Sequence, residues 1–506
     1  MATPRVGLGL PAALERHRRL LEGAAIVVAV LGVGALSGRL AMSHYGKAVV
    51  EVGIGVPVLI AVARRPMLAV VALLTVVASI FAYNNLPRAN LPGHPPINLA
   101  DMMLIASVGG TLWRRPWNSW PAPVRRYAIA LLVLLALASV ATVRTALIGY
   151  TQSRDALYEY RNWMYLAVAL TVALELSGTL WRRWIDIAIG AATVVAIVSI
   201  AAAASHGLAN ELLKIDPTAV YSPSVVAAAG GVSLGGTSRI RLEGLYFIYS
   251  MCIPAVVMSI IVRDRWQRLR VVALLLMLAA VALSLNRNMY GGTVVGLIVT
   301  ALIAGPRIRH RLAMTIAASV LVVVLVTLTS ITPAISSQVG KRLATVLTPS
   351  QIVQSSSYQD RAYELSFALP SIARNPLYGV GPRQPYGAFV ITGSGTSNRF
   401  FVQNLYIDIA TDYGIPTALA FLLIPCVCLA YGASRVRHAA NPFDRALLAA
   451  AIGTLVSLML SCLVDTFVQD PETTVAFGAA CGFLLAAALR TERDPHKDMS
   501  LDVRTI

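Results

Sequence analysis

The chain has 506 residues, of which 57% are hydrophobic and only 13% are charged, and its mean hydropathy is +0.69. This composition excludes a soluble globular domain, and the length excludes a simple membrane anchor. A net charge of +18 would suggest a nucleic-acid partner in a soluble protein. Here the basic residues lie in short clusters between apolar runs, where they orient a membrane protein. We therefore expect an all-α polytopic membrane protein that binds no nucleic acid.

Apolar runs recur along the whole chain, and many approach the roughly 20 residues that a helix needs to cross a bilayer. We expect about fourteen transmembrane helices. They lie near residues 24–42, 48–63, 67–83, 97–113, 127–143, 163–180, 184–204, 244–262, 271–286, 291–305, 312–332, 413–433, 446–465 and 473–490.

Clusters of arginine and lysine follow every second expected span. Because basic loops stay on the cytoplasmic side, we place both termini in the cytoplasm and the polar, glycine-rich loops outside. The expected outer loops are Asn84 to Pro96, Thr145 to Asn162, Ser205 to Glu243, Asn286 to Tyr290 and Ile331 to about Thr411.

Five parts follow from this arrangement. They are a cytoplasmic segment at 1–23, a membrane domain at 24–332 with about eleven spans, an extracytoplasmic catalytic loop at 333–411, a second membrane domain at 412–490 with about three spans, and a cytoplasmic tail at 491–506.

The long outer loop is where we expect chemistry, because it is polar, rich in glycine and irregular. Its pattern predicts short helices over Ile335 to Leu347 and over Tyr358 to Ile372. Pro376 and Gly379 are expected to end the second of them.

Arginines in outer segments run against the charge bias of membrane proteins and need another reason to be there. Arg239 and Arg241 precede the span near 244, Arg287 ends the span near 271, and Arg361 lies on the predicted loop helix. A guanidinium forks onto phosphate oxygens with two hydrogen bonds, which favours a phosphate-bearing ligand. Snorkelling to lipid headgroups, or pairing of Arg361 with Glu364, is the alternative, and the residues leave it open.

Cysteines and histidines do not suggest a metal centre. All five cysteines lie in or beside apolar runs, and the histidines expected outside, His44, His94 and His206, are far apart in sequence. We expect no metal and no other cofactor, and we interpret the cysteines as packing residues.

Motifs follow one another through the long loop. Arg361 is followed by Asn375-Pro376-Leu377-Tyr378-Gly379-Val380-Gly381, a polar loop, Asn404-Leu405-Tyr406 and Tyr413-Gly414-Ile415-Pro416. This series resembles the O-antigen ligase and polymerase superfamily, whose members have many spans and one large outer loop near the C-terminal end. The resemblance covers about Ser238 to Leu422, since the surroundings of Arg241 and Arg287 are similar to the family's arginine positions.

The resemblance implies a metal-independent glycosyltransferase in the bacterial cytoplasmic membrane. It would move a glycan from a polyprenyl diphosphate to a glycan or lipid acceptor on the extracytoplasmic face, with other polysaccharide assembly proteins as further partners. The implied diphosphate-binding residues are Arg239, Arg241, Arg287 and Arg361. The implied residues of the acceptor and the loop are Asn404, Tyr406 and Arg374.

The sequence departs from the family at one position that concerns catalysis. The family often has a histidine directly before the Asn-x-Tyr element, where this chain has Gln403. An amide cannot serve as a base near neutral pH. Either a nearby acid such as Asp360, Glu364, Asp408 or Asp412 acts as the base, or departure of the diphosphate dominates and Gln403 only orients the acceptor.

We favour a polymerase over three alternatives: an O-antigen-type ligase, a transporter or flippase, and a non-catalytic scaffold. Fourteen spans and the missing histidine favour a polymerase over a ligase. A transporter or flippase of lipid-linked saccharides would be expected to have midplane acids and inverted repeats. Only Glu51 and Glu175 are prominent charges inside the expected spans, and we see no inverted repeat. A non-catalytic assembly scaffold would not need arginines around one outer loop.

Overall fold

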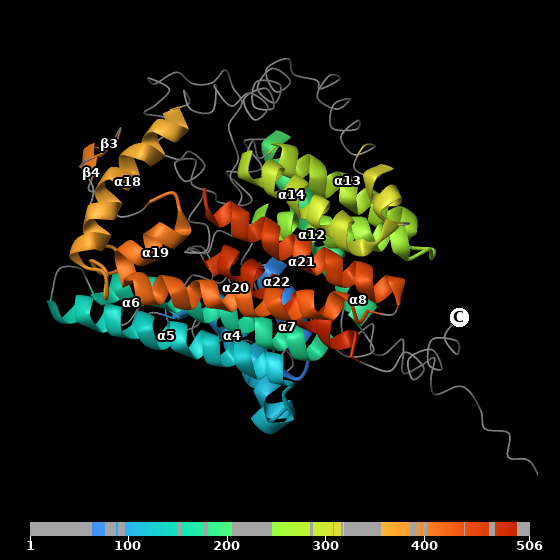
Figure 1. Ribbon diagram of the computed structural model, residues 1–506, viewed down its shortest axis with the longest axis horizontal. Coiled ribbons are helices and arrows are strands. Elements are labelled where there is room, and N and C mark those ends of the chain that lie inside the picture. Colours follow the sequence, from blue (N-terminus) through green and yellow to red (C-terminus); the bar gives the residue numbers. More distant parts are fainter. Residues whose placement is uncertain are drawn as a thin grey trace, which may run out of the picture.

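The computed structural model describes most of the helical part of the chain. The described residues are 63–75, 88–89, 97–148, 153–176, 181–204, 245–283, 287–306, 308–314, 317, 356–384, 386, 390–392, 395–397, 402–439, 441–464 and 471–492. Within them the secondary structure is helical (Figure 1) apart from turns and two short antiparallel hairpins.

The helices of the described part are α3 (Pro66–Thr75), α4 (Leu99–Arg114), η3 (Trp117–Ser119), α5 (Ala122–Ile148), α6 (Ser153–Met164), η4 (Tyr165–Ala167), α7 (Val168–Leu176), α8 (Trp181–Ala204), α12 (Leu245–Ile261), α13 (Gln267–Leu283), α14 (Arg287–Ala304), α18 (Ser356–Arg374), α19 (Leu405–Tyr413), α20 (Ile415–Val436), α21 (Pro442–Cys462) and α22 (Pro471–Arg490). The hairpins pair β1 (Arg88–Ala89) with β2 (Ile97–Asn98) and β3 (Val390–Thr392) with β4 (Gly395–Ser397).

Five helices in the described part, namely α5, α8, α20, α21 and α22, contain stretches long and apolar enough to cross a membrane. The all-α polytopic fold is confirmed to this extent, whereas the count of fourteen spans, the five-part division and the loop layout stay predictions. Helix α18 coincides with the loop helix expected over Tyr358 to Ile372. The helix expected over Ile335 to Leu347 and the first two expected spans lie largely or wholly outside the described residues.

The structure adds elements that the hydrophobic pattern did not indicate. Helix α6 lies in the segment expected to be the outer loop Thr145 to Asn162, and α5 extends past the expected span 127–143 at both ends. Helix α6 is too polar to have been recognised as a span. Its residues Glu159, Asn162 and Trp163 are nevertheless buried by tertiary packing.

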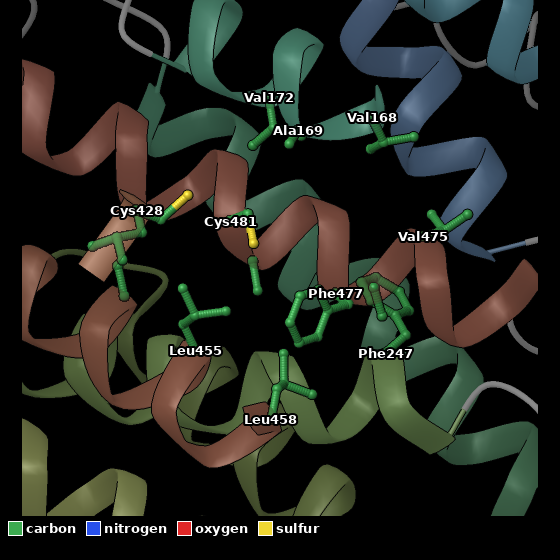
Figure 2. Close-up of a cluster of buried hydrophobic side chains, with 14 of the residues drawn as sticks. Val168, Ala169, Val172, Phe247, Cys428, Leu455, Leu458, Val475, Phe477 and Cys481 are labelled. Carbon is green, nitrogen blue, oxygen red and sulfur yellow. The ribbon is translucent and has the colours of Figure 1, made fainter. Parts of the chain in front are cut away.

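The core forms where α22, which is buried over most of its length, packs against α7, α12, α20 and α21. Figure 2 shows side chains of α7, α12, α20, α21 and α22 converging around Phe477. Cys428 and Cys481 are fully buried in this cluster, in agreement with their interpretation as packing residues.

Close packing of α14 against α21 depends on small residues. A Cβ added to Gly453 would lie 2.4 Å from the carbonyl oxygen of Gly296, so glycine lets the two backbones touch. The two helices run antiparallel, because Gly292 lies beside Ser461 and Thr300 contacts Ala449. Small residues at such contacts are typical of membrane helix interfaces.

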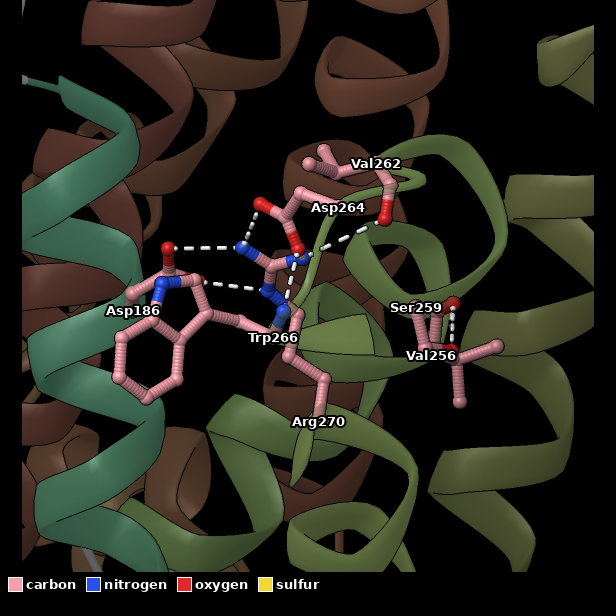
Figure 3. Close-up of polar contacts among 7 residues, drawn as sticks. All are labelled: Asp186, Val256, Ser259, Val262, Asp264, Trp266 and Arg270. Atoms are coloured by element: carbon pink, nitrogen blue, oxygen red, sulfur yellow. Dashed lines mark hydrogen bonds and ion pairs between the residues drawn. The ribbon is translucent and has the colours of Figure 1, made fainter. Parts of the chain in front are cut away.

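The arginine-rich helix ends gather on one side of the bundle. Arg270, at the start of α13, binds Asp186 of α8 with two hydrogen bonds of 2.8 and 2.9 Å and also binds Asp264 (Figure 3). Arg490, at the end of α22, lies over the ring of Trp181 at the start of α8. At the opposite ends of the helices lie α18, α19 and the β3–β4 hairpin (Figure 1).

Candidate functional site

Two of the sequence motifs lie side by side in the structure. The backbone N–H of Val380 donates to the carbonyl oxygen of Thr411 at 2.7 Å, and the N–H of Gly381 donates to that of Asp412 at 3.0 Å. Beyond α19, the N–H of Ile415 donates to the carbonyl oxygen of Pro376 at 2.8 Å. The Asn-Pro-Leu-Tyr-Gly-Val-Gly segment is therefore docked along the end of α19 and the Tyr-Gly-Ile-Pro turn.

This docking explains why glycine occupies two motif positions. Gly379 has a φ of +65°, and an added Cβ would lie 2.4 Å from the carbonyl carbon of Asp412. Gly414 has a φ of +90° and a ψ of 163°, and its Cβ would lie 2.3 Å from the carbonyl oxygen of Leu377. These are conformations that favour glycine, and there is no room for a side chain.

Two candidate acids hold the backbone that precedes α19. Glu364 of α18 is buried, and its Oε2 accepts a hydrogen bond from the N–H of Gln403 at 2.7 Å. Asp408 is fully buried, and its Oδ1 accepts from the N–H of Val402 at 2.7 Å and from the hydroxyl of Tyr386 at 3.3 Å. Both carboxylates thus fix the position from which the Gln403 side chain extends.

The neighbouring motif residues secure α19 itself. The side chain of Asn404 caps the helix by accepting from the N–H of Ile407 at 3.2 Å. Tyr406 donates its hydroxyl to the carbonyl oxygen of Met459 in α21 at 3.0 Å. These contacts give both residues a structural role at the site.

A third acid approaches this region from α6. Glu159 is buried, and its Oε2 lies 3.5 Å from Nε of Arg383. Burial raises the pKa of Asp412 well above its usual range, and the charges of Asp408 and Glu159 raise it further, whereas Arg383 lowers it. Burial also raises the pKa of Asp408, against the hydrogen bond from Val402. The site therefore holds carboxyl groups that bind protons more tightly than free ones.

Arg361 lies where α18 meets the end of α21. Its Nη2 donates to the carbonyl oxygen of Val464 at 3.0 Å, and among the described residues its buried Nε has no hydrogen-bond partner. Helix α14 begins with Arg287 at the same end of α21, because Gly292 of α14 lies beside Ser461. The structure thus places the backbone of Arg287 and the side chain of Arg361 in one region.

The other predicted residues are placed differently. Arg374 is exposed at the last turn of α18, about 20 Å from Arg361 along a helix that rises 1.5 Å per residue. Arg239, Arg241 and the side chain of Asp360 lie outside what the structure describes. Among the described residues, no group of three or more histidine, cysteine or acidic side chains is arranged to hold a metal ion.

Four residues at the site were not singled out from the sequence: Arg144, Glu159, Arg383 and Tyr386. Arg144, near the end of α5, donates from Nη1 to the carbonyl oxygen of Gly379 at 2.9 Å. The argument from arginines outside the membrane would have found Arg144 and Arg383 had it been applied to every outer position. Nothing in the local sequence marks Glu159 or Tyr386.

Residues 272–422 match the family model described as O-antigen ligase. This stretch of the chain is similar to the O-antigen ligase family. It covers less than a third of the chain, from α13 into α20, and contains Arg287, Arg361 and all the loop motifs, while Arg239 and Arg241 precede it. No curated protein shows significant similarity to the chain.

The match confirms the resemblance expected from the motifs. Together, the apolar helices and the O-antigen ligase domain indicate a multi-pass membrane protein. The family implies a lipid-linked glycan as substrate and an acceptor in a membrane.

Proposed function

We propose that this protein is a metal-independent membrane glycosyltransferase that polymerises oligosaccharide repeat units carried on polyprenyl diphosphate. The observation that carries the proposal is that Arg287 and Arg361, which both lie within the matched residues 272–422, come together at the end of α21: Arg361 contacts Val464, and α14 begins with Arg287 beside the same helix end. The site would face the extracytoplasmic side of the bacterial cytoplasmic membrane, because the opposite helix ends carry the arginine clusters typical of the cytoplasmic side.

In this proposal the arginines hold the donor diphosphate. Arg287 and Arg361, with Arg239 and Arg241, would donate charge-assisted hydrogen bonds to its oxygens. An acceptor hydroxyl attacks the anomeric carbon, a new C–O bond forms, and the bond to the diphosphate breaks. The diphosphate leaves with the electron pair, the proton of the attacking hydroxyl passes to the departing diphosphate or to solvent, and the cations stabilise the charge that develops on the leaving group.

Gln403 would orient the acceptor hydroxyl in this reaction. Glu364 and Asp408 act as positioning residues, since each accepts a backbone N–H beside Gln403 and neither carboxylate is exposed. Asn404 and Tyr406 keep α19 in place beneath the acceptor, and Arg374 lies exposed at the edge of the loop.

The test is a reconstituted assay. Purified protein in liposomes receives a radiolabelled polyprenyl-diphosphate repeat unit in EDTA, without ATP, and chain growth is followed on gels. We expect a ladder of products that is lost with Arg361→Gln and kept with Arg268→Gln, an exposed arginine at the opposite helix ends.

Other outcomes would replace the proposal. Transfer of a single unit to a lipid acceptor would identify a ligase. Movement of intact substrate across the bilayer would identify a transporter, and growth that needs a divalent ion would contradict metal independence. Absence of turnover with correctly folded protein would favour a scaffold.

A further inference from the structure

A second cationic region lies at the far end of α18 from Arg361. Near its start, α18 contacts the end of α21 through Arg361. After its last residue, Arg374, comes the segment that docks on the start of α20. Arg361 and Arg374 are separated by about 20 Å at 1.5 Å per residue. The turn Gly379 to Gln384 follows this second end, and two arginines meet there.

Arg383 is held in an uncommon conformation on this turn. Its φ of +60° is in the left-handed region, which side chains other than glycine rarely adopt. The backbone N–H groups of Val380 and Gly381 are fixed by α19, so the surrounding structure holds the turn in place. Strain of this kind is concentrated at ligand sites.

The guanidinium of Arg383 is only partly used. Its Nε pairs with the buried carboxylate of Glu159, while the side chain is 52% exposed. Glu159 therefore orients the guanidinium and leaves its outer edge available to a ligand.

Arg144 supplies a second guanidinium to the same turn. Its Nη1 donates to the carbonyl oxygen of Gly379, and its charge lies 5.8 Å from the centre of the Tyr378 ring. The next residue, Thr145, lies against Gly381, where an added Cβ would come within 2.3 Å of its Oγ1. Both arginines are thus fixed to one turn before any ligand arrives.

Exposed apolar side chains of α5 lie on both sides of Arg144 along the helix. Val140, Val143 and Leu147, at helical spacing around Arg144, are 50%, 56% and 81% exposed. An amphiphile with an anionic head and an apolar tail matches both features, because its head would meet the arginines while its tail lies along α5.

We propose that Arg144 and Arg383 form a second anion site, which binds the diphosphate of a second lipid-linked glycan, the acceptor. This proposal rests on the proposed function and distinguishes a polymerase, in which both reactants carry a polyprenyl diphosphate, from a ligase. The acceptor hydroxyl forms the new C–O bond, the donor diphosphate leaves the Arg361 site, and the product stays on the lipid held at Arg144 and Arg383. The ends of α18 at Arg361 and Arg374 are about 20 Å apart, and the second site lies on the turn that follows the Arg374 end.

The test measures how many diphosphate ligands bind to each chain in the absence of catalysis. The full chain in nanodiscs is titrated with radiolabelled geranylgeranyl diphosphate, and bound ligand is counted per chain. We expect two sites in the wild type, one after Arg144→Gln with Arg383→Gln, one after Arg361→Gln, and two in the control Arg437→Gln, an exposed arginine at the other helix ends.

A conservative variant distinguishes loss of the site from loss of folding. Arg383→Lys keeps a positive charge beside Glu159 but loses the fork, so it should weaken the second site about tenfold or more, the loss of one charge-assisted bond, while the melting temperature is kept. Two unchanged sites in the double glutamine variant would overturn the proposal. Equal displacement by phosphatidylglycerol would also overturn it, in favour of a phospholipid site.

The outcome is separable from that of the proposed function. Two bound diphosphates without chain growth would leave the second site in place and contradict the polymerase. Chain growth with a single bound diphosphate would support the polymerase and contradict the second site.

Discussion

Gln403 illustrates how much of the site depends on single residues. Its backbone N–H is held by Glu364, and the preceding N–H is held by Asp408, so two buried carboxylates fix a residue that has no basic side chain. Arg361 is likewise fixed by one hydrogen bond to Val464 and keeps further donors. Substitutions of single residues can therefore separate catalysis by a base from binding of the diphosphate.

At the proposed donor site we expect arginine to be needed for its shape as well as its charge. Arg241→Lys, Arg287→Lys and Arg361→Lys should each lower turnover by about tenfold or more, because one charge-assisted bond contributes roughly 1.5–3 kcal/mol. Expression and melting temperature should stay normal. Full activity of both Arg287→Lys and Arg287→Ala at matched protein levels would remove Arg287 from the site and favour contact with lipid headgroups.

At Gln403 the variants separate orientation from base catalysis. If orientation suffices, Gln403→Ala lowers turnover moderately and Gln403→His is tolerated. Asp408→Asn and Glu364→Gln keep an oxygen that can accept the backbone N–H, so they should retain much of the activity. Complete loss in either amide variant, with little effect of Gln403→Ala, would instead identify a carboxylate base. Initial rates in the reconstituted assay measure this.

At the scale of elements, α19 is the piece on which the others are assembled. The motif segment docks along its end, α18 holds the backbone before it, and α6 brings Glu159 to Arg383 nearby. Its own packing is tight, since Trp163 of α6 meets the ring of Tyr413 edge-on at 6.0 Å. Changes in this packing should alter stability and activity together.

Gly414→Ala tests the docking. The φ and ψ of Gly414 belong to a region that is nearly exclusive to glycine, so alanine should cost about 1–3 kcal/mol in strain, and the clash with Leu377 adds to this. Melting temperature and turnover should both fall. Gly190→Ala in α8 is the matched control, because nothing lies within 4 Å of its added Cβ, and it should be neutral or slightly stabilising. Equal melting temperatures for the two variants would contradict the docking.

The buried acids give stability a predictable dependence on pH. A folded-state pKa raised above the ordinary 3.8 means that the folded protein binds more protons than the unfolded chain between the two values. Stability should therefore be greatest at low pH and fall as pH rises through the raised pKa of Asp408 and Asp412. Melting temperatures from about pH 5 to 9 measure the slope, which Asp412→Asn should reduce. A slope unchanged in this variant would exclude Asp412 as its source.

At the scale of the whole molecule, arginines on the two sides of the bundle make different contacts. Arg270, Arg445 and Arg490 make contacts that join the ends of α13, α14, α21, α22 and α8 on one side. Arg144 and Arg361 contact the candidate site on the other. The positive-inside rule predicts that the first side, where the sequence has its arginine clusters, is cytoplasmic.

Cysteine labelling tests which side is which. In a variant whose native cysteines are replaced by serine, Ser394→Cys should react with a membrane-impermeant maleimide in intact cells, whereas Ser434→Cys, near the end of α20, should react only after the cytoplasm is opened. The reverse pattern would invert the topology and place the candidate site in the cytoplasm.

The sequence by itself determined the class of the protein and the position of its motifs. Hydrophobic runs set where α5, α8, α20, α21 and α22 form, because burial in a bilayer requires apolar length whatever the partners are. Breakers such as Pro376 and Gly379 likewise marked the end of α18, since local backbone preferences act within a few residues.

Only the tertiary structure decided which distant residues meet. Arg144 and Glu159 lie more than 200 positions before the loop that they contact, so no local pattern connects them with Arg383. Burial of Asp408 and Asp412, and with it their raised pKa, depends on the packing of α6 and α18 around α19. The sequence gives each side chain its chemistry, and packing gives it its neighbours, its exposure and its charge.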